Sequence, residues 1–325
     1  MENYTVKKYN TSQRELWDRF IEEAKNATFL FKRDFMDYHS HRFQDNSLLV
    51  FKEEKLVAVL PANIENNVLF SHQGLTYGGL VLGKRSSFLD AFESFKSVLT
   101  FLESESVVTL NLKLIPKIYH VLPSDEIDYL LFLTNATLSR RDITSCIDSN
   151  NRLKIKSSNR LRGIKKGAKN ELVVKKEASF EPFWNEVLEP NLLQTHNQKP
   201  VHSLAEIKLL QSRFPNNILQ FNVYRENEIV AGATIFETEN VAHAQYISAN
   251  EKGRQTGGLD FLFNYLLNHY SHKKYFDFGI VNESGGMKVN KGLLHWKETF
   301  GGRSITHDFY EVKTENHKLL NDIFL

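Results

Sequence analysis

The sequence predicts a mixed α/β protein (α+β, mixed sheet) built from two copies of one unit. Three observations support this: a length of 325 residues, an internal repeat, and the order of helix-like and strand-like segments in each copy. The length suits two domains of about 150 residues each. We therefore expect domains at residues 1–150 and 151–325, each with its own core and with a cleft between them where ligands bind.

The repeat consists of two stretches that align without a gap. Residues 50–62 read VFKEEKLVAVLPA and residues 223–235 read VYRENEIVAGATI, at a constant offset of 173 residues. Each stretch is typical of two strands joined by a polar turn. Coincidence between two ordinary hairpins is the alternative, and the matching order of the flanking segments favours an internal duplication.

The same elements are expected in the same order in each copy. A helix comes first, with capping boxes predicted at Ser12 with Glu15 and at Ser203 with Glu206. The hairpin and a third strand follow, and then a glycine-bearing loop, an amphipathic helix and a buried strand. The closing strands are VVTLNLKLI at residues 107–115 and KKYFDFGIV at residues 273–281.

Composition narrows the classes of function. Apolar residues make up 41% of the chain and charged residues 25%, as in ordinary globular proteins. No apolar run is long enough to span a bilayer, and the N-terminus lacks the apolar core of a signal peptide, so we expect a cytoplasmic protein. Cys146 is the single cysteine, which excludes an internal disulfide and a thiolate metal cage. No HExxH, GxSxG or Walker loop is present, and we predict no metal.

Positive charge gathers in one segment. Between Arg152 and Lys176 stand ten basic residues against one acid, Glu171. On a helix, Arg162 shares a face with Lys165 or Lys166, which suits a phosphate-bearing ligand or RNA. A solvated helix face is the alternative.

The glycine-bearing loop between the third strand and the amphipathic helix resembles that of the GNAT acyltransferase fold, in which backbone amides hold a pyrophosphate. The nearest match to the GNAT pattern RxxGxG/A is RQTGGL, with leucine in place of the last small residue. The resemblance implies that Arg254, Gly257 and Gly258 bind the cofactor, coenzyme A.

The tandem arrangement, the basic element SNRLRGIKKGAKN and the run DFG…NxGLxxWKxxFGG resemble the Fem-type family, also described as FemAB-like or BioF2-like acyltransferases. The resemblance covers nearly the whole chain and is strongest from Ser157 to Tyr310. It implies transfer of an acyl or aminoacyl group to an amine of a cell-envelope precursor, such as a nucleotide sugar, a sugar lipid or a muropeptide. It also implies acyl-CoA or aminoacyl-tRNA as donor, so tRNA is a candidate partner and DNA is not. A non-catalytic GNAT-like module that binds envelope precursors or RNA is the alternative.

Candidate catalytic residues follow from the chemistry. Acyl transfer to an amine passes through a tetrahedral oxyanion, and Lys297, which matches the family's lysine, is expected to stabilise that charge. Asp277 and Glu283 are candidate general bases, with a structural pairing of Asp277 as the alternative. The first copy lacks the lysine motif, so we expect the second copy to carry the chemistry. Residues expected to hold the acceptor are Arg160, Arg162, Lys165, Lys166, Asn290 and Trp296, with Asn290 also capping the helix of Lys297.

Overall fold

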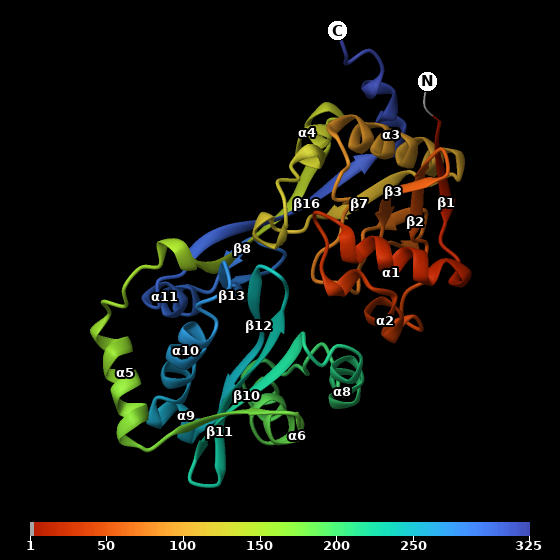
Figure 1. Cartoon of the computed structure of the whole chain (residues 1–325). Helices are drawn as coiled ribbons and strands as arrows, with labels where there is room; N and C mark the ends of the chain where they lie inside the picture. The colour runs from red at the N-terminus through yellow and green to blue at the C-terminus, as the bar shows by residue number, and fades with distance from the viewer. Residues whose placement is uncertain (1–2) are drawn as a thin grey trace. The chain divides into compact units, whose positions relative to one another are not determined.

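The computed structural model describes residues 3–325, and the chain divides into two compact units (Figure 1). The first comprises Met1–Asp142 and Thr306–Leu325, and the second comprises Ile143–Ile305. Strand β8 (Thr137–Asp148) leads the chain out of the first unit and strand β16 (Arg303–Lys313) leads it back. The return of the C-terminal segment to the first unit is not anticipated by the sequence. No helix within residues 3–325 is both long enough and apolar enough to cross a membrane.

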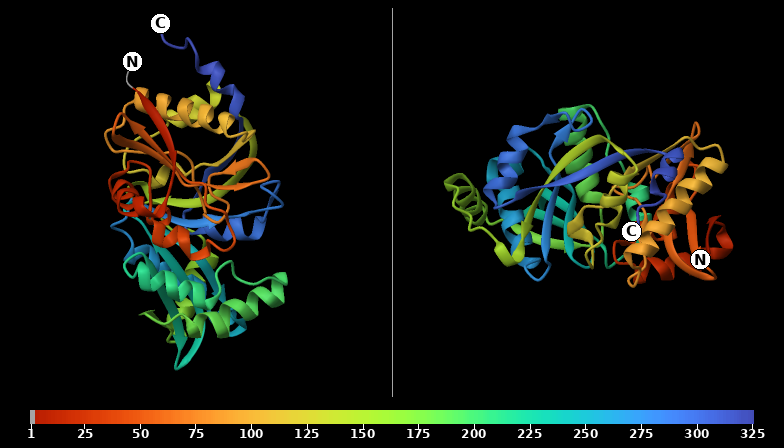
Figure 2. Two further views of the ribbon diagram at one scale, coloured as in Figure 1. Left: turned by 90° about the vertical axis from the view of Figure 1, so that its right-hand side faces the viewer. Right: turned by 90° about the horizontal axis from the view of Figure 1, so that it is seen from above.

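The first unit contains two sheets. One has the order β1-β2-β3-β6, and in the other β4, β5, β7 and β16 are neighbours. Helix α3 packs against β1, β2 and β3 (Figure 2), and its apolar face joins a core that includes Leu48, Leu99 and Leu110. The elements are β1 (Tyr4–Lys8), α1 (Arg14–Glu23), α2 (Arg33–Met36), β2 (Leu48–Lys52), β3 (Lys55–Leu60), β4 (Asn63–Glu65), β5 (Val68–Phe70), β6 (Val81–Leu82), α3 (Phe88–Ser104), β7 (Thr109–Lys113) and α4 (Glu126–Leu133).

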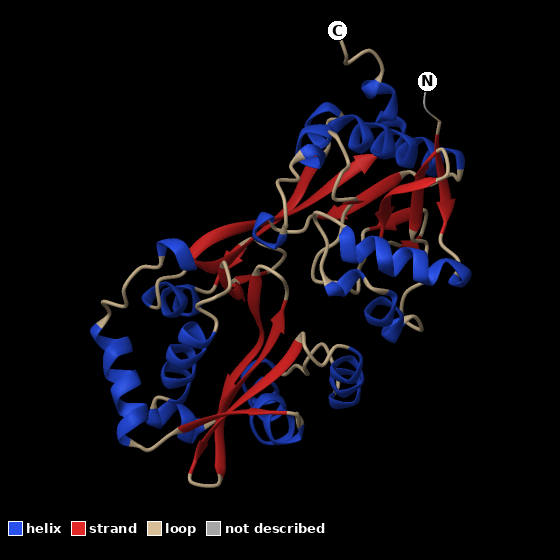
Figure 3. Ribbon diagram, viewed as in Figure 1, coloured by secondary structure: helices blue, strands red, loops and turns tan. Residues whose placement is uncertain are grey.

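The second unit is built on a sheet in which β8, β13, β12, β11, β10 and β9 are neighbours. Helix α10 packs on one face of this sheet, with α5 outside it, and α6 and α8 cover the other face (Figure 3). The elements are α5 (Ser158–Lys169), β9 (Val173–Glu177), α6 (Glu181–Phe183), α7 (Glu189–His196), α8 (Leu204–Arg213), β10 (Ile218–Arg225), β11 (Glu228–Glu237), β12 (Val241–Ala249), α9 (Glu251–Thr256), α10 (Gly258–His269), β13 (Tyr275–Ile280), β14 (Asn282–Glu283), β15 (Lys288–Val289) and α11 (Lys291–Thr299).

The predicted repeat extends to the pairing of individual residues. In the β2–β3 hairpin Val50 pairs with Ala58, and the next pair is Phe51 with Leu56 across a register shift. At the offset of 173 residues, the β10–β11 hairpin has the pair Val223–Ala231 and then Tyr224–Ile229, with its shift at the same place. The turn residues Glu53 and Glu226 adopt φ of 53° and 55°. A shared register, a shared bulge and a shared left-handed turn residue support the internal duplication.

One position explains where the two copies differ. Strand β11 runs unbroken from Glu228 to Glu237, whereas its counterpart is split into β3 and β4, with Pro61 at the break. Proline has no backbone N–H to donate to a neighbouring strand, so it interrupts a ladder. The two halves of this counterpart therefore lie in different sheets, β3 beside β2 and β6, and β4 beside β5.

Each copy also contains one parallel strand pair. In the first unit β5 and β7 pair Leu69 with Leu110 and Phe70 with Asn111. In the second unit β12 and β13 pair Ala242 with Phe276 and His243 with Asp277. The pair Phe70–Asn111 is therefore the counterpart of the pair His243–Asp277.

One predicted capping box is confirmed and the other is wrong. The amide of Glu206 donates to Ser203 Oγ at 3.2 Å, and the amide of Ser203 donates back to the Glu206 carboxylate at 2.8 Å. At the N-terminus, Asn10 rather than Ser12 is the cap, because its side-chain oxygen already accepts the Ser12 amide at 3.0 Å. Asn10 caps a 3-10 turn, and α1 begins after it.

Candidate functional site

The candidate site lies in the second unit where β12 and β13 part. His243 and Asp277 form the last pair of the parallel ladder. Directly beyond them, the register of β12 against β11 shifts and leaves Gln245 as an extra residue. On β13, the register against β8 shifts between Asp277 and Ile280, where Gly279 has φ of +79°. Such bulges re-aim side chains and are common beside active sites.

Asp277 is a buried and tightly held carboxylate. Its oxygens accept hydrogen bonds from the Thr144 hydroxyl, from the Gly279 amide at 2.9 Å and from His243 Nδ1 at 2.9 Å. Burial alone would raise the pKa of Asp277, but the charge and hydrogen bond of His243, with the other two donors, lower that pKa to about 2. A carboxylate held in this way is a weak proton acceptor. These hydrogen bonds favour a structural role for Asp277, which the sequence analysis gave as the alternative to a general base.

His243 completes the pair, and sequence reasoning did not single it out. An ionised carboxylate can only accept hydrogen bonds, so Nδ1 of His243 carries the hydrogen that it donates to Asp277. His243 makes no other hydrogen bond within residues 3–325, and its side chain is 14% exposed. The one signal in the sequence was the histidine itself, within the strand VAHAQYISA. Its partner could not be identified from the sequence, because the register of β12 against β13 brings the two residues together.

Lys297 reaches the same point from α11. Its side chain is 2% exposed, and Nζ donates to the carbonyl oxygens of Gly279 and Ile280 at 2.8 and 2.9 Å. Burial lowers the pKa of Lys297 to about 8, although the charge of Asp277 opposes this. An ammonium group has three N–H donors, and these carbonyls take two of them. The third N–H has no acceptor within residues 3–325.

Asn290 fixes the start of the helix that carries Lys297. Its Oδ1 accepts the Leu293 amide at 3.0 Å, which is the predicted N-cap. Its amide nitrogen donates to Glu283 Oε1 at 3.3 Å. Glu283 lies in β14 and is exposed, so the structure places it on the surface next to the cap.

Trp296 belongs to an aromatic cluster. Its ring packs edge-on against Phe263 at a centroid distance of 5.0 Å and against Phe300 at 5.1 Å. Its Nε1 donates to Asp260 Oδ1 at 3.2 Å. Trp296 therefore packs α11 against α10.

The basic helix α5 divides the predicted acceptor-binding residues into two groups. Arg160 forms an ion pair with Asp260 on α10, and both side chains are largely buried. Arg162, Lys165 and Lys166 are exposed. The ion pair of Arg160 holds α5 against α10. The other three side chains form a positively charged surface on α5.

The predicted cofactor turn is covered by α5. Gly257 has φ of +80°, and a Cβ added to it would lie 2.5 Å from the carbonyl oxygen of Gly163 on α5. Arg254 donates to Ala249 O at 2.8 Å and to Asn191 Oδ1 at 3.0 Å. Gly258 follows as the first residue of α10 and packs on Ala231 and Gly253. Gly163 of α5 thus lies against the predicted cofactor turn, and the Arg254 side chain is hydrogen-bonded within the second unit.

The parting strands of the first unit carry different chemistry. Phe70 and Asn111 occupy the positions of His243 and Asp277 and line a cavity of about 230 Å³. Lys113 also lines it and donates to Leu75 O at 2.5 Å, and burial lowers the pKa of Lys113 to about 8. No acid–base pair stands at the Phe70–Asn111 position.

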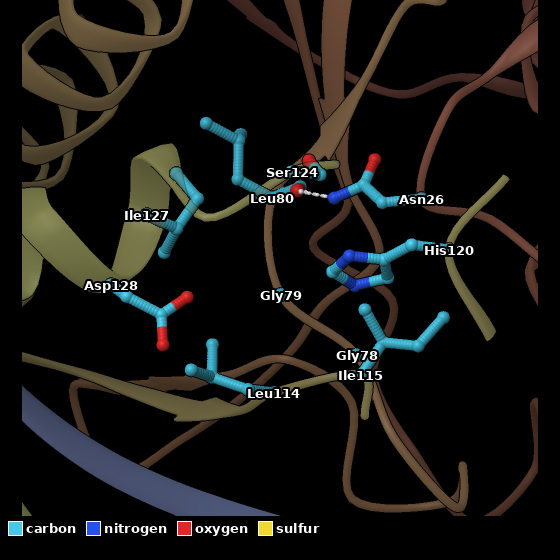
Figure 4. Close-up of a pocket in the computed structure, with 10 residues that line it drawn as sticks. All are labelled: Asn26, Gly78, Gly79, Leu80, Leu114, Ile115, His120, Ser124, Ile127 and Asp128. Atoms are coloured by element: carbon cyan, nitrogen blue, oxygen red, sulfur yellow. Dashed lines mark hydrogen bonds between the residues drawn. The ribbon is translucent and has the colours of Figure 1, made fainter. Parts of the chain in front are cut away.

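A second pocket of the first unit is water-sized. Its volume is about 20 Å³, and Asn26 at its edge donates to Leu80 O at 3.0 Å (Figure 4). A space of that size holds about one water molecule. It offers no room for a substrate.

Neither a protein-family model nor a curated protein sequence matches the chain. Several solved structures match the chain. FemX matches with a TM-score of 0.68 and 9% identity over 97% of this chain and 99% of FemX. The C-terminal domain of a putative lysylphosphatidylglycerol synthetase from Agrobacterium fabrum matches with a TM-score of 0.61 and 12% identity, over 96% of each chain. A tandem GNAT protein from the clavulanic acid biosynthesis pathway matches with a TM-score of 0.52 and 10% identity, over 97% of this chain and 99% of that protein.

Identities this low establish the fold alone. The mixed α/β class and the tandem GNAT-like arrangement expected from the sequence are both confirmed by these matches. The chain has the tandem GNAT-like fold shared by FemX and the lysylphosphatidylglycerol synthetase domain.

Proposed function

We propose that this protein transfers an acyl or aminoacyl group to an amine of a cell-envelope precursor. The observation that carries the proposal is the buried Lys297 ammonium beside the His243–Asp277 pair, at the point where two parallel strands part. The fold supports it, because FemX, a lysylphosphatidylglycerol synthetase domain and a tandem GNAT protein share that fold.

The lysine suits the charge that develops in acyl transfer. When an amine attacks an ester or thioester carbonyl, the carbonyl oxygen becomes negative and needs a fixed donor. Two N–H groups of Lys297 are bound to β13, which holds the ammonium in place before substrate arrives. The third N–H is the one that would meet the oxyanion.

Gln245 is a further candidate for holding substrate. Its Oε1 is buried and has no hydrogen-bond partner within residues 3–325. A buried acceptor left unpaired costs about 1–3 kcal/mol, so a ligand N–H placed there would recover that free energy. An amide or amine of the donor or acceptor has the required chemistry.

The position of α5 and its charged side chains bear on which donor the protein uses. Because α5 fills the space beside Gly257, we propose a donor that is not held by its pyrophosphate at α10. The exposed Arg162, Lys165 and Lys166 favour a polyanionic carrier, and aminoacyl-tRNA is a carrier of that kind. The same charges would also hold a phosphate-bearing acceptor, which is the competing use of this surface.

To test this function, the protein is incubated with either charged tRNA or acyl-CoA as donor and with amino sugars, muropeptides or aminated lipids as acceptors. Mass spectrometry of the acceptor reports transfer. We expect a mass gain with charged tRNA and none with acyl-CoA. Reversing the charge of Lys165 and Lys166 together should raise the KM for tRNA and leave kcat unchanged.

A binding module is the second candidate, and the covered glycine turn is the observation that favours it. A protein that had lost its donor site would still bind the acceptor. Tight acceptor binding without transfer from either donor would favour this function over the enzyme.

A further inference from the structure

The two copies of the fold differ at one pair of equivalent positions. The last parallel pair is Phe70–Asn111 in the first unit and His243–Asp277 in the second. Phenylalanine and asparagine cannot exchange protons near neutral pH, whereas histidine and aspartate can. A pair needed only to end the ladder would not require a hydrogen-bonded imidazole.

We propose that His243 is the general base of the transfer reaction and that Asp277 is its positioning residue. This inference rests on the proposed function, and it replaces the direct base role that the sequence suggested for Asp277. Three groups at the parting point can be compared as proton acceptors: Asp277, Lys297 and His243.

Only His243 offers an accessible lone pair. The oxygens of Asp277 accept from Thr144, Gly279 and His243, and the carboxyl is 3% exposed. The ammonium of Lys297 has no lone pair while it is protonated. His243 donates through Nδ1, so in its uncharged form the lone pair is on Nε2, which is neither hydrogen-bonded nor sealed from solvent.

A glycine lies beside the ring of His243. A Cβ at Gly279 would lie 3.5 Å from Cε1 of His243, in ordinary van der Waals contact with the imidazole. The φ of +79° also favours glycine at this position. The charged groups that face His243 are Asp277 from β13 and, through the Gly279 carbonyl, Lys297 from α11.

The proton balance is simple. The acceptor ammonium first loses one proton to water, and the free amine then attacks the carbonyl carbon of the donor. The new C–N bond forms as Nε2 of His243 takes the second proton from that nitrogen. When the C–O or C–S bond of the donor breaks, the imidazolium gives this proton to the leaving oxygen or sulfur. His243 returns to its starting form.

The catalytic test uses His243→Gln and His243→Ala. We expect a fall in kcat of about 100- to 10,000-fold, the usual contribution of a general base, with little change in the KM for the acceptor. Added imidazoles should restore activity to His243→Ala, and the restored rate should rise with the basicity of the imidazole. His272→Gln, a change at an exposed histidine in the turn after α10, is the matched control.

Asp277→Asn separates positioning from catalysis. It should lower kcat without creating any response to imidazole, because the ring of His243 remains in place. A His243→Gln variant as active as the His272→Gln control would overturn the proposal. So would a loss of activity on Glu283→Gln with none on His243→Gln.

A second measurement does not depend on turnover. Long-range ¹H–¹⁵N NMR of the wild-type protein should show uncharged His243 with its proton on Nδ1 and none on Nε2, and Asp277→Asn should weaken that preference. A proton on Nε2 in the wild type contradicts the proposal even if no donor supports transfer. Inactivity with the expected tautomer present would instead count against the proposed function.

Discussion

His243 Nδ1 lies 2.9 Å from Asp277 Oδ2, and these two residues are the last pair before β12 and β13 separate. Lys297 donates to the carbonyl oxygens of Gly279 and Ile280, two and three residues further along β13. A base, its positioning carboxylate and a cation thus meet where these two strands part. The last pair of the equivalent ladder in the first unit is Phe70 and Asn111.

Replacing the lysine tests the oxyanion role. Lys297→Met should lower kcat by about 100- to 1,000-fold, the usual cost of losing one oxyanion donor. The matched control is Lys291→Met, at the exposed first position of the same helix. Equal activity of the two variants would remove Lys297 from the mechanism.

The pH dependence of kcat follows from the same residue. The pKa of Lys297 is lowered to about 8, so the protonated fraction falls as the pH rises through 8. Because the cation is the active form, kcat should decline above about pH 8. A kcat that stays level to pH 10 in the wild type would show that the charge of Lys297 is not needed.

Asp277 should make stability depend on acid pH. Its folded-state pKa of about 2 lies below the ordinary value of 3.8, so the folded state binds fewer protons than the unfolded state. This contribution, about 2 kcal/mol, is complete above pH 4 and is lost as the pH falls through 2. Urea unfolding at pH 7 and at pH 3 should show a smaller difference for Asp277→Asn than for the wild type. Identical differences would mean that this carboxyl is not held as described.

The packing of α5 on α10 can be tested at Gly167. A Cβ there would lie 2.6 Å from Cβ of Phe261, so the helices must move apart. Gly167→Ala should lower the free energy of unfolding by about 1–3 kcal/mol, despite the better helix propensity of alanine. Gly292→Ala on α11 is the control, because its nearest atom is 3.7 Å away, and it should be neutral or stabilising. A stabilised Gly167→Ala would show that α5 does not press on α10.

Much of the fold was predictable because its signals are local. The hairpin at residues 50–62 and its copy at residues 223–235 share turn chemistry and alternation, and their registers agree residue by residue. The Asn290 cap was also readable, since capping depends on neighbours three residues away. The cap at Asn10 was missed because Asn10 and Ser12 are both good cap residues, and Asn10 caps a 3-10 turn that precedes α1.

The remainder depends on contacts between distant segments. His243 meets Asp277 across a register that no local pattern reveals. The covering of Gly257 by Gly163 joins residues almost a hundred positions apart. The pairing of Val312 with Leu110 returns the C-terminus to the first unit and is a contact of the same long-range kind.

The most direct test of the account is single-turnover transfer to a defined amine acceptor, followed by mass spectrometry. With charged tRNA as donor, the wild-type protein should add one acyl group to the acceptor, and Lys297→Met should add almost none. An acceptor that binds tightly and keeps its mass with both charged tRNA and acyl-CoA would contradict the central claim that this protein is a transferase.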